Sequence, residues 1–267
     1  MVKVAVVTGS SSGIGYETSL LLARNQFTTY ATMRNLSKGE GLREIASKEK
    51  IPLNVTQLDV NNDSSVDNTI DDIIRENDRI DILVNNAGYD LFGSLEELSL
   101  EEIKQQFETN VFGVIRATKA VIPTMRKQGD GTIVNISSVG GRIGLIPFNT
   151  AYHASKFALE GFTESLRQEL AEFNINIILI EPGFISSKFM DNIKTAKGFD
   201  SNKSPYAKTV QQVFLGFQPM MASSSHPTEV AHTILNAVNS PSPELRHPVG
   251  KTQNPSSKHG PNYPTKN

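Results

Sequence analysis

Tyr152 and Lys156 stand four residues apart in a stretch of good helix formers that includes Ala154, Ala158 and Leu159. Both side chains should therefore project from one face of a helix. A nearby ammonium favours the phenolate and lowers the pKa of a tyrosine from about 10 toward neutrality. A tyrosine in that state can give or take a proton at cellular pH. The alternative is an ordinary surface pair on a helix, and Tyr-x-x-x-Lys alone does not exclude it.

Ser138 is a third candidate for the same chemistry. It follows residues 132–136, an apolar run that predicts a strand, and it precedes the helix of Tyr152. Its hydroxyl could hold a substrate oxygen against the tyrosine hydroxyl.

A glycine-rich loop near the N-terminus predicts a nucleotide site. The apolar run at residues 4–7 predicts a buried strand, which leads through Thr-Gly-Ser-Ser-Ser-Gly-Ile-Gly into an amphipathic helix. Gly9 permits a sharp turn, Gly13 lets the backbone approach a pyrophosphate, and Gly15 lets the helix pack closely. The helix N-terminus would face the anion. The other loop residues that would line such a site are Ser11, Ser12 and Ile14. Because the spacing departs from Gly-x-Gly-x-x-Gly, the flanking strand and helix carry this prediction, and a simple turn is the alternative.

The second predicted strand, residues 27–33, ends at Arg34. An NAD-selective unit places an acidic residue near this distance to bind the adenosine 2′-hydroxyl, whereas residues 28–37 contain neither Asp nor Glu. The Arg34 guanidinium could instead bind a 2′-phosphate. The sequence therefore favours NADP(H) over NAD(H), and a solvated loop charge is the alternative for Arg34.

Strand and helix patterns alternate through the middle of the chain. This alternation predicts an α/β fold with a single Rossmann-type, doubly wound parallel sheet and helices on both faces. Polar or small residues end several of the strands, where such sheets bind ligands. Asp59 and Val60 end one of them, and Asp59 could reach an adenine amino group or simply start a helix. The turn formed by Asn86, Ala87 and Gly88 ends the next.

A helical pattern covers residues 100–127, and we expect a break near Pro123. Asn110 lies inside this pattern. Asparagine is a poor choice for a helix interior because its side chain competes with the backbone. We therefore expect a local distortion or a polar task there, with a buried hydrogen bond as the alternative.

Composition limits the possible partners. The chain of 267 residues has a net charge of -2 and no cysteine, and its pI is about 6.2. This charge argues against nucleic acid and anionic lipid as partners, and the lack of cysteine excludes disulfides and thiolate chemistry. No apolar run is long enough for a membrane span, no metal site is suggested, and the chain begins with a strand pattern. We expect a cytoplasmic protein that acts on small molecules.

Two C-terminal segments complete the sequence. Residues 184–226 look irregular but are rich in large apolar groups, so they could form a lid over a lipophilic substrate or the inner face of small covering helices. Residues 251–267 contain three prolines and no aliphatic side chain, which predicts a disordered tail. Residues 1–250 should form one domain.

Taken together, these motifs resemble the short-chain dehydrogenase/reductase family, and the resemblance spans residues 2 to about 250. The matching positions are the loop at 8–15, the turn at 86–88, the set Asn110, Ser138, Tyr152 and Lys156, and the segment Pro182, Gly183, Ile185 and Ser187. The stretch around Ser138 and Tyr152 is similar to the hydroxysteroid and retinol dehydrogenase branch.

The resemblance implies an NADP(H)-dependent enzyme that interconverts an alcohol and a ketone or aldehyde on a small lipophilic substrate. Tyr152 would exchange the proton, Ser138 would orient the substrate oxygen, and Lys156 would lower the tyrosine pKa and bind the nicotinamide ribose. Asn110 would position a water on the proton path. A homodimer or homotetramer is implied as well. The alternatives are a 3-oxoacyl carrier-protein reductase, with Arg126, Lys127 and Arg167 as a basic patch, and a non-enzymatic NADP-sensing regulator.

Overall fold

The structure is a computed structural model that describes residues 2–144, 146–186 and 193–250. Ser187 and the tail at residues 251–267 lie outside these described residues, so the predictions made for them stay predictions.

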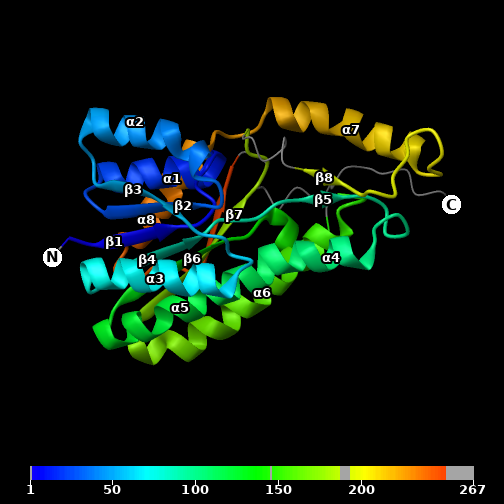
Figure 1. Ribbon diagram of the computed structural model, residues 1–267. Coiled ribbons are helices and arrows are strands. Elements are labelled where there is room, and N and C mark those ends of the chain that lie inside the picture. The colour runs from blue at the N-terminus through cyan, green and yellow to red at the C-terminus, as the bar shows by residue number, and fades with distance from the viewer. Residues whose placement is uncertain (1, 145, 187–192, 251–267) are drawn as a thin grey trace.

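One parallel sheet forms the centre of the protein. Within the described residues its seven strands lie in the order β3-β2-β1-β4-β6-β7-β9 (Figure 1). The strands are β1 (Val4–Val7), β2 (Thr28–Met33), β3 (Leu53–Gln57), β4 (Ile82–Asn85), β6 (Gly131–Ile136), β7 (Ile175–Pro182) and β9 (Arg246–Val249). Every residue of β1, β4 and β6 is buried, as their runs of β-branched and apolar residues require of strands covered on both faces. Strands β1 to β3 are added toward one edge of the sheet and β4, β6, β7 and β9 toward the other, so the strand order reverses between β1 and β4. Doubly wound sheets open a ligand crevice at this point.

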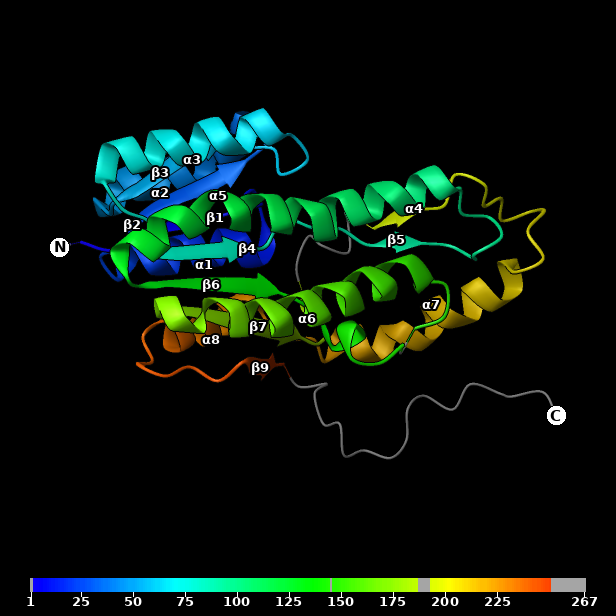
Figure 2. The same cartoon turned by 90° about the horizontal axis from the view of Figure 1, so that it is seen from below.

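Helices cover both faces of this sheet. Among the described residues the α-helices are α1 (Gly13–Arg24), α2 (Glu40–Glu49), α3 (Asp63–Asn77), α4 (Leu100–Phe107), α5 (Gly113–Gln128), α6 (Thr150–Leu170), α7 (Ala207–Ala222) and α8 (Pro227–Val238), of which α4 and α7 lie beyond the main sheet (Figure 1). One core cluster joins the sheet to α3, α5 and α6, and the clusters on the other face join it to α1, α2 and α8 (Figures 1 and 2). The fold is the predicted Rossmann type.

The long helical region breaks at a different place from the one predicted. Pro123 lies inside α5, which continues through it to Gln128. The interruption is a π-helical turn, Glu108–Phe112, between α4 and α5. Asn110 lies in this turn, which confirms the expected local distortion. A π turn adds a residue to the helix and is frequent at functional sites.

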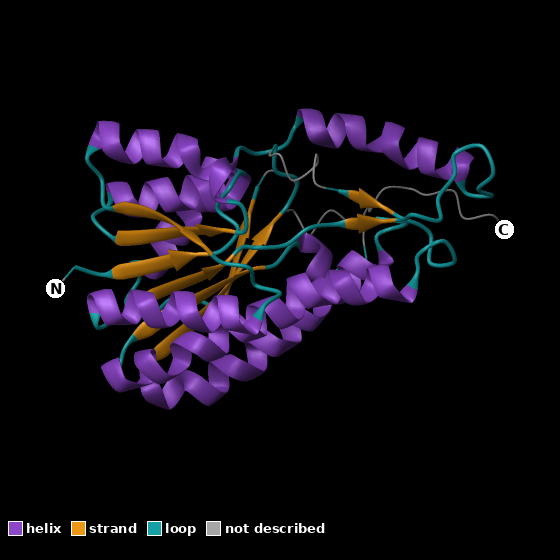
Figure 3. Cartoon of the chain, in the orientation of Figure 1, coloured by secondary structure: helices purple, strands orange, loops and turns teal. Residues whose placement is uncertain are grey.

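The region 184–226 is more regular than its sequence suggests. It contains α7, whose interior Gly216 and Pro219 disguise the helix in the sequence. A two-stranded parallel sheet, β5 (Leu91–Phe92) and β8 (Lys194–Thr195), lies beyond the main sheet and between α7 and α4 (Figure 3). Val210 and Val213 of α7 pack against Phe92 of β5. Residues 193–226 and β5 thus pack together beyond the main sheet, and they are called the covering unit below.

Candidate active site

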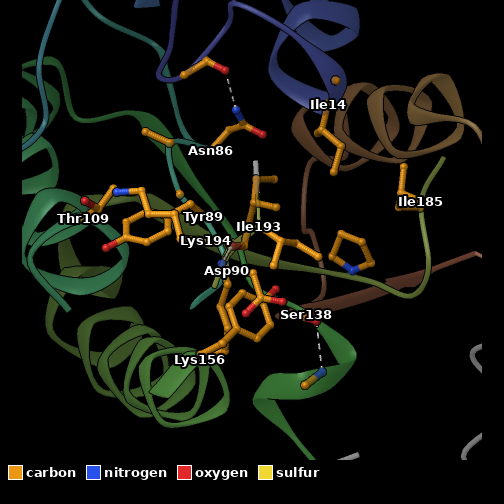
Figure 4. A pocket seen from close by; sticks show the side chains of 18 of the residues that line it. Ile14, Asn86, Tyr89, Asp90, Thr109, Ser138, Lys156, Ile185, Ile193 and Lys194 are labelled. Atoms are coloured by element: carbon orange, nitrogen blue, oxygen red, sulfur yellow. Dashed lines mark hydrogen bonds between the residues drawn. The ribbon is translucent and has the colours of Figure 1, made fainter. Parts of the chain in front are cut away.

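A cleft of about 870 Å³ opens at the carboxyl ends of the central strands (Figure 4). Its wall includes the glycine loop after β1, the ends of β2 and β3, the turn after β4, and the start of α6. It also includes the segment after β7 and part of α7. The fold thus brings together, in one cleft, site residues that the sequence separates by more than a hundred positions.

The glycine loop is clamped by the turn after β4. Asn86 Nδ2 donates to the carbonyls of Thr8 at 2.9 Å and of Gly9 at 3.0 Å. Gly9 has φ of 69°, and a Cβ there would lie 2.8 Å from the Ala87 Cα. A Cβ on Gly15 would lie 2.7 Å from the Gly9 carbonyl oxygen, as well as 2.4 Å from Asn86 Nδ2. Glycine is required at both positions because neighbouring backbone occupies the space of a side chain.

The same loop leaves room and hydrogen-bond donors for an anion. Gly13 begins α1 with φ of 62°, and the Ser12 side chain makes no capping bond within the described residues. The first N–H groups of α1 therefore remain available at the positive end of the helix dipole. The residues Ser11, Ser12, Gly13 and Ile14 line the cleft at this point. The arrangement fits the pyrophosphate of a dinucleotide.

Two basic side chains mark the end of β2. Arg34 and Lys38 both line the cleft, and sequence reasoning had identified only Arg34. Arg34 is exposed, and its guanidinium forms no hydrogen bond or ion pair with the residues that the structure describes. Asp59 and Val60 lie in the cleft wall after β3, where the Asp59 carboxylate accepts a hydrogen bond from the Asn61 N–H at 3.1 Å. Asp59 therefore makes a turn as well as facing the cleft.

Tyr152, Ser138 and Lys156 meet at the other end of the cleft. Ser138 hydrogen bonds to Tyr152 and also accepts a bond from the Gly140 N–H at 3.0 Å. Lys156 Nζ lies 5.7 Å from the centre of the tyrosine ring and donates to the Ile136 carbonyl at 2.7 Å. The predicted group is thus assembled on α6 and the segment after β6.

The expected lowering of the Tyr152 pKa is not found in this protein without a cofactor. Burial raises the pKa of Tyr152, and the nearby Asp90 carboxylate raises it further, whereas the bond with Ser138 lowers it. Burial also lowers the pKa of Lys156 to about 8, against the opposing effects of Glu160 and Asp90. With a pKa of about 8, Lys156 is mostly protonated at neutral pH, so burial of the tyrosine hydroxyl, together with the Asp90 carboxylate, outweighs its positive charge.

Asn110 lies behind the cleft wall rather than in it. Its Nδ2 donates to the Tyr89 carbonyl at 3.0 Å and to Ser155 Oγ at 3.2 Å. Its Oδ1 accepts from the Tyr89 N–H at 3.1 Å. The side chain is 1% exposed, and these bonds tie the segment after β4 to α6. The role on a proton path stays a prediction.

Sequence reasoning missed Asp90 and its partner Asn149. Asp90 lines the cleft, and Asn149 Nδ2 donates to its Oδ2 at 2.6 Å. Burial raises the pKa of Asp90 to about 6. The signal was a carboxyl group two residues after the turn at 86–88, at the ligand-binding edge of the sheet.

Apolar side chains form part of the wall of the cleft that contains Tyr152. The cleft there is lined by Phe92, Ile146, Phe184, Ile193 and Phe214. Phe184 and Phe214 come from the predicted lid, whereas Phe199 and Tyr206 from the same segment pack inside the covering unit. Phe184 and Phe214 thus line the cleft, whereas Phe199 and Tyr206 belong to the inner face of the covering unit; a lid over a substrate stays a prediction. Nothing is described for Phe189, which lies outside the described residues.

The fold and the cleft define a Rossmann-type α/β protein with a tyrosine and a lysine in its ligand crevice. The family model for short chain dehydrogenase matches residues 3–198, and the chain belongs to that family.

Its relatives include an uncharacterized oxidoreductase, YusZ, from Bacillus subtilis, which is 40% identical over 93% of this chain and 89% of its own length. Human retinol dehydrogenase 8 is 40% identical over 91% of this chain and 80% of its own length. Human 17-beta-hydroxysteroid dehydrogenase type 1 is 36% identical over 91% of this chain and 76% of its own length. The protein is therefore an oxidoreductase from the hydroxysteroid and retinol branch of the family.

Solved structures of the family have the same fold. A short-chain dehydrogenase from Streptomyces avermitilis superposes with a TM-score of 0.80 at 31% identity, covering 94% of this chain and 89% of its own. ElxO with NADP bound superposes with a TM-score of 0.75 at 29% identity, covering 90% and 92%.

Proposed function

We propose that the protein is an NADP(H)-dependent oxidoreductase that interconverts an alcohol and a ketone or aldehyde on a lipophilic substrate. The observation that supports this most is the shared cleft: a glycine loop fitted to a dinucleotide lies at one end and Ser138, Tyr152 and Lys156 at the other. Such a cleft can hold a cofactor and a substrate side by side.

The residues that would hold the cofactor run the length of the cleft. They are Gly9, Ser11, Ser12, Gly13, Ile14, Arg34, Asp59, Val60, Asn86, Ala87, Gly88, Tyr152, Lys156, Pro182, Gly183 and Ile185. When bound, the nicotinamide supplies or accepts the hydride. Lys156, which now bonds to the Ile136 carbonyl, would turn part of its donor capacity to the ribose hydroxyls.

Tyr152 is the group that moves the proton. Its hydroxyl is hydrogen bonded to Ser138, so a substrate oxygen placed beside both would accept one bond from each. Without a cofactor, the raised pKa keeps the tyrosine protonated, which suits the donor role in reduction. Lys156 is the positive group that would lower this pKa once its own charge is stabilised by a bound anion.

Two features support NADP(H) over NAD(H). Arg34 and Lys38 both lie in the cleft wall at the end of β2, where a 2′-phosphate would be bound. In addition, the acidic residues that line the cleft, among those described, follow β3 and β4 or lie in the π turn. None of them lies at the end of β2, where a carboxylate would repel a 2′-phosphate.

The apolar part of the cleft wall supports a lipophilic substrate. Phe92, Ile146 and Phe214 line the same cleft as Tyr152. Two relatives are named for retinol and for 17-beta-hydroxysteroids, which are lipophilic compounds. We extend this class of substrate to the present chain.

The carrier-protein alternative loses its structural basis. Arg126 stacks over Phe173 at 5.7 Å, and Arg167 donates to the Pro243 carbonyl, so both lie near the amino ends of β7 and β9. The cleft opens at the opposite ends of these strands. A carrier bound at these residues would have to deliver its substrate along the length of α6 to reach Tyr152, which makes this alternative less favoured.

A homodimer or homotetramer remains part of the proposal. Leu100, Phe112 and Phe157 are 74%, 51% and 47% exposed on α4, the π turn and α6. A second copy packed there would remove this apolar surface from water. Among the described residues, no helix is long and apolar enough to cross a bilayer. The expected cytoplasmic location stays a prediction.

The test is to offer the protein NADPH together with lipophilic ketones and aldehydes, and with a 3-oxoacyl thioester for comparison. The reaction is monitored by the loss of NADPH absorbance. Tyr152→Phe removes the proposed proton donor, and Tyr16→Phe makes the same change on α1 outside the cleft wall as described. We expect turnover in the parent and in Tyr16→Phe but not in Tyr152→Phe. NADPH binding with no turnover of any carbonyl compound would instead support the sensing regulator.

A further inference from the structure

Asp90 is a buried carboxyl group at the reacting end of the cleft that the reaction as proposed does not use. It directly precedes β5 and is 7% exposed. Figure 4 shows Asp90 on the same side of the pocket as Ser138 and Lys156. It also influences the pKa of Tyr152, so it lies within electrostatic range of the tyrosine hydroxyl.

One oxygen of this carboxyl group is left without a donor. Oδ2 accepts the bond from Asn149 at 2.6 Å. The Leu91 N–H also lies close enough to the carboxyl group to lower its pKa, but Oδ1 is buried and has no hydrogen bond of normal geometry among the residues that the structure describes. A buried carboxylate oxygen without a donor is costly, so its presence beside a ligand cleft points to a donor on the ligand.

The charged groups around Asp90 indicate what kind of donor fits. On α6, Tyr152 and Lys156 face it, and the Lys156 ammonium is already bonded to Ile136. On β8, the Lys194 ammonium lies over the Tyr89 ring at 4.1 Å, while its backbone N–H donates to the Asp90 carbonyl. Because Lys156 and Lys194 both line the cleft, a cationic ligand group would be repelled by two ammonium groups. A neutral hydroxyl meets the carboxylate without that repulsion.

We propose that Asp90 is a specificity residue: its Oδ1 accepts a hydrogen bond from a hydroxyl group of the substrate, one or two carbons from the reacting carbonyl. The inference rests on the proposed function and narrows it to lipophilic hydroxyketones and the diols they form. The apolar remainder of the substrate lies against Phe92, Ile146 and Phe214. A site built to accept a substrate hydroxyl discriminates strongly against an analogue that lacks it, because the buried acceptor then stays unpaired.

The experiment compares hydroxyketones with analogues in which a methyl group replaces the hydroxyl. The pairs are 1-hydroxydecan-2-one with undecan-3-one, and 1-hydroxyundecan-3-one with dodecan-4-one. In the parent protein with NADPH, we expect kcat/KM to favour the hydroxyketone of at least one pair by about 10- to 100-fold, the value of one hydrogen bond to a charged group. Asp90→Asn should reduce that ratio several-fold, because a hydrogen bond between a hydroxyl and a neutral amide is weaker than one to a carboxylate. Asp71→Asn makes the same change at an exposed position of α3 and should leave the ratio as it is.

Three results would overturn the proposal. The first is a parent protein that shows no preference in either pair, which needs no variant to establish. The second is a ratio that Asp90→Asn leaves unchanged. The third is an equal loss on both members of a pair, which would make Asp90 a positioning residue that acts through Tyr152.

A binding measurement separates this proposal from the proposed function. The four ketones are added to the parent and to Asp90→Asn, and the shift of the thermal midpoint is recorded. A larger shift with a hydroxyketone that becomes smaller in Asp90→Asn supports the inference even if no ketone is reduced. Equal shifts within both pairs would overturn it, whatever the turnover.

Discussion

Asp90→Asn should make the cofactor-free protein more stable at neutral pH and change it much less in acid. Burial raises the pKa of Asp90 from 3.8 to about 6. Between these values the folded protein keeps a proton that the unfolded chain releases, so the free energy of unfolding falls as the pH rises. A shift of about 2 units corresponds to about 3 kcal/mol of stability lost above pH ~6. Asparagine does not ionise and avoids this loss.

The pH window of the measurement matters because Lys156 acts in the opposite direction. Burial lowers its pKa from 10.5 to about 8, so between these values the folded protein binds fewer protons than the unfolded chain. Its contribution to stability therefore rises with pH above about 8. Measurements below this value isolate the effect of Asp90.

The assay is urea unfolding of parent and variant, followed by circular dichroism, at pH ~4.5, ~6 and ~7.5. From the two pKa values of Asp90, the stability difference between Asp90→Asn and the parent should grow by about 2 kcal/mol from the lowest to the highest pH. Asp71→Asn, at its exposed position, should show no such growth. A difference that does not depend on pH, or a variant less stable than the parent at the highest pH, would refute the reasoning.

Tyr152→Phe should lower kcat by about 100-fold or more through lost acid–base catalysis while the Kd for NADPH stays close to that of the parent, and near-normal turnover would end the assignment of the proton donor. Arg34→Ser combined with Lys38→Ser should reduce the ratio of kcat/KM for NADPH over NADH about tenfold or more, with Lys48→Ser on α2 as the control; an unmoved ratio would show that neither cation meets a 2′-phosphate. Phe112→Asp should shift sizing-column elution toward the monomer, because the exposed phenylalanine would no longer fit an apolar interface; unchanged elution would place the interface elsewhere. Gly9→Ala should lower the thermal midpoint and NADPH affinity together, since its Cβ would meet backbone at 2.8 Å, and normal values of both would contradict the described loop.

The elements of the central sheet could be predicted because each is specified locally. Runs of β-branched residues alternate with amphipathic helices, and the handedness of the connections then leaves few topologies. The placement of Tyr152 and Lys156 could be predicted for the same reason, because two residues that are four positions apart in a helix project from the same face.

Features that depend on the surroundings could not be predicted. The pKa of Tyr152 is dominated by burial, which exists only once the chain has folded around it. The site of the helix break was misjudged because Pro123 has a known local effect, whereas the π turn at Glu108–Phe112 is held by bonds between Asn110 and Tyr89. Asp90 was missed because a carboxyl group in a loop carries no sign of its burial.

The clamp on the glycine loop has a consequence for how the chain acquires its ligand-binding ability. The carbonyl of Gly9 is held by Asn86, 77 residues later in the chain. Loop closure over that distance delays such contacts relative to local ones. A chain emerging from the ribosome can therefore form β1, α1 and β2 but cannot complete the loop until the turn after β4 has been synthesised. Protection of the Asn86 and Ala87 amides, which both donate to Thr8, should accordingly appear late in refolding, when the two halves of the sheet have met.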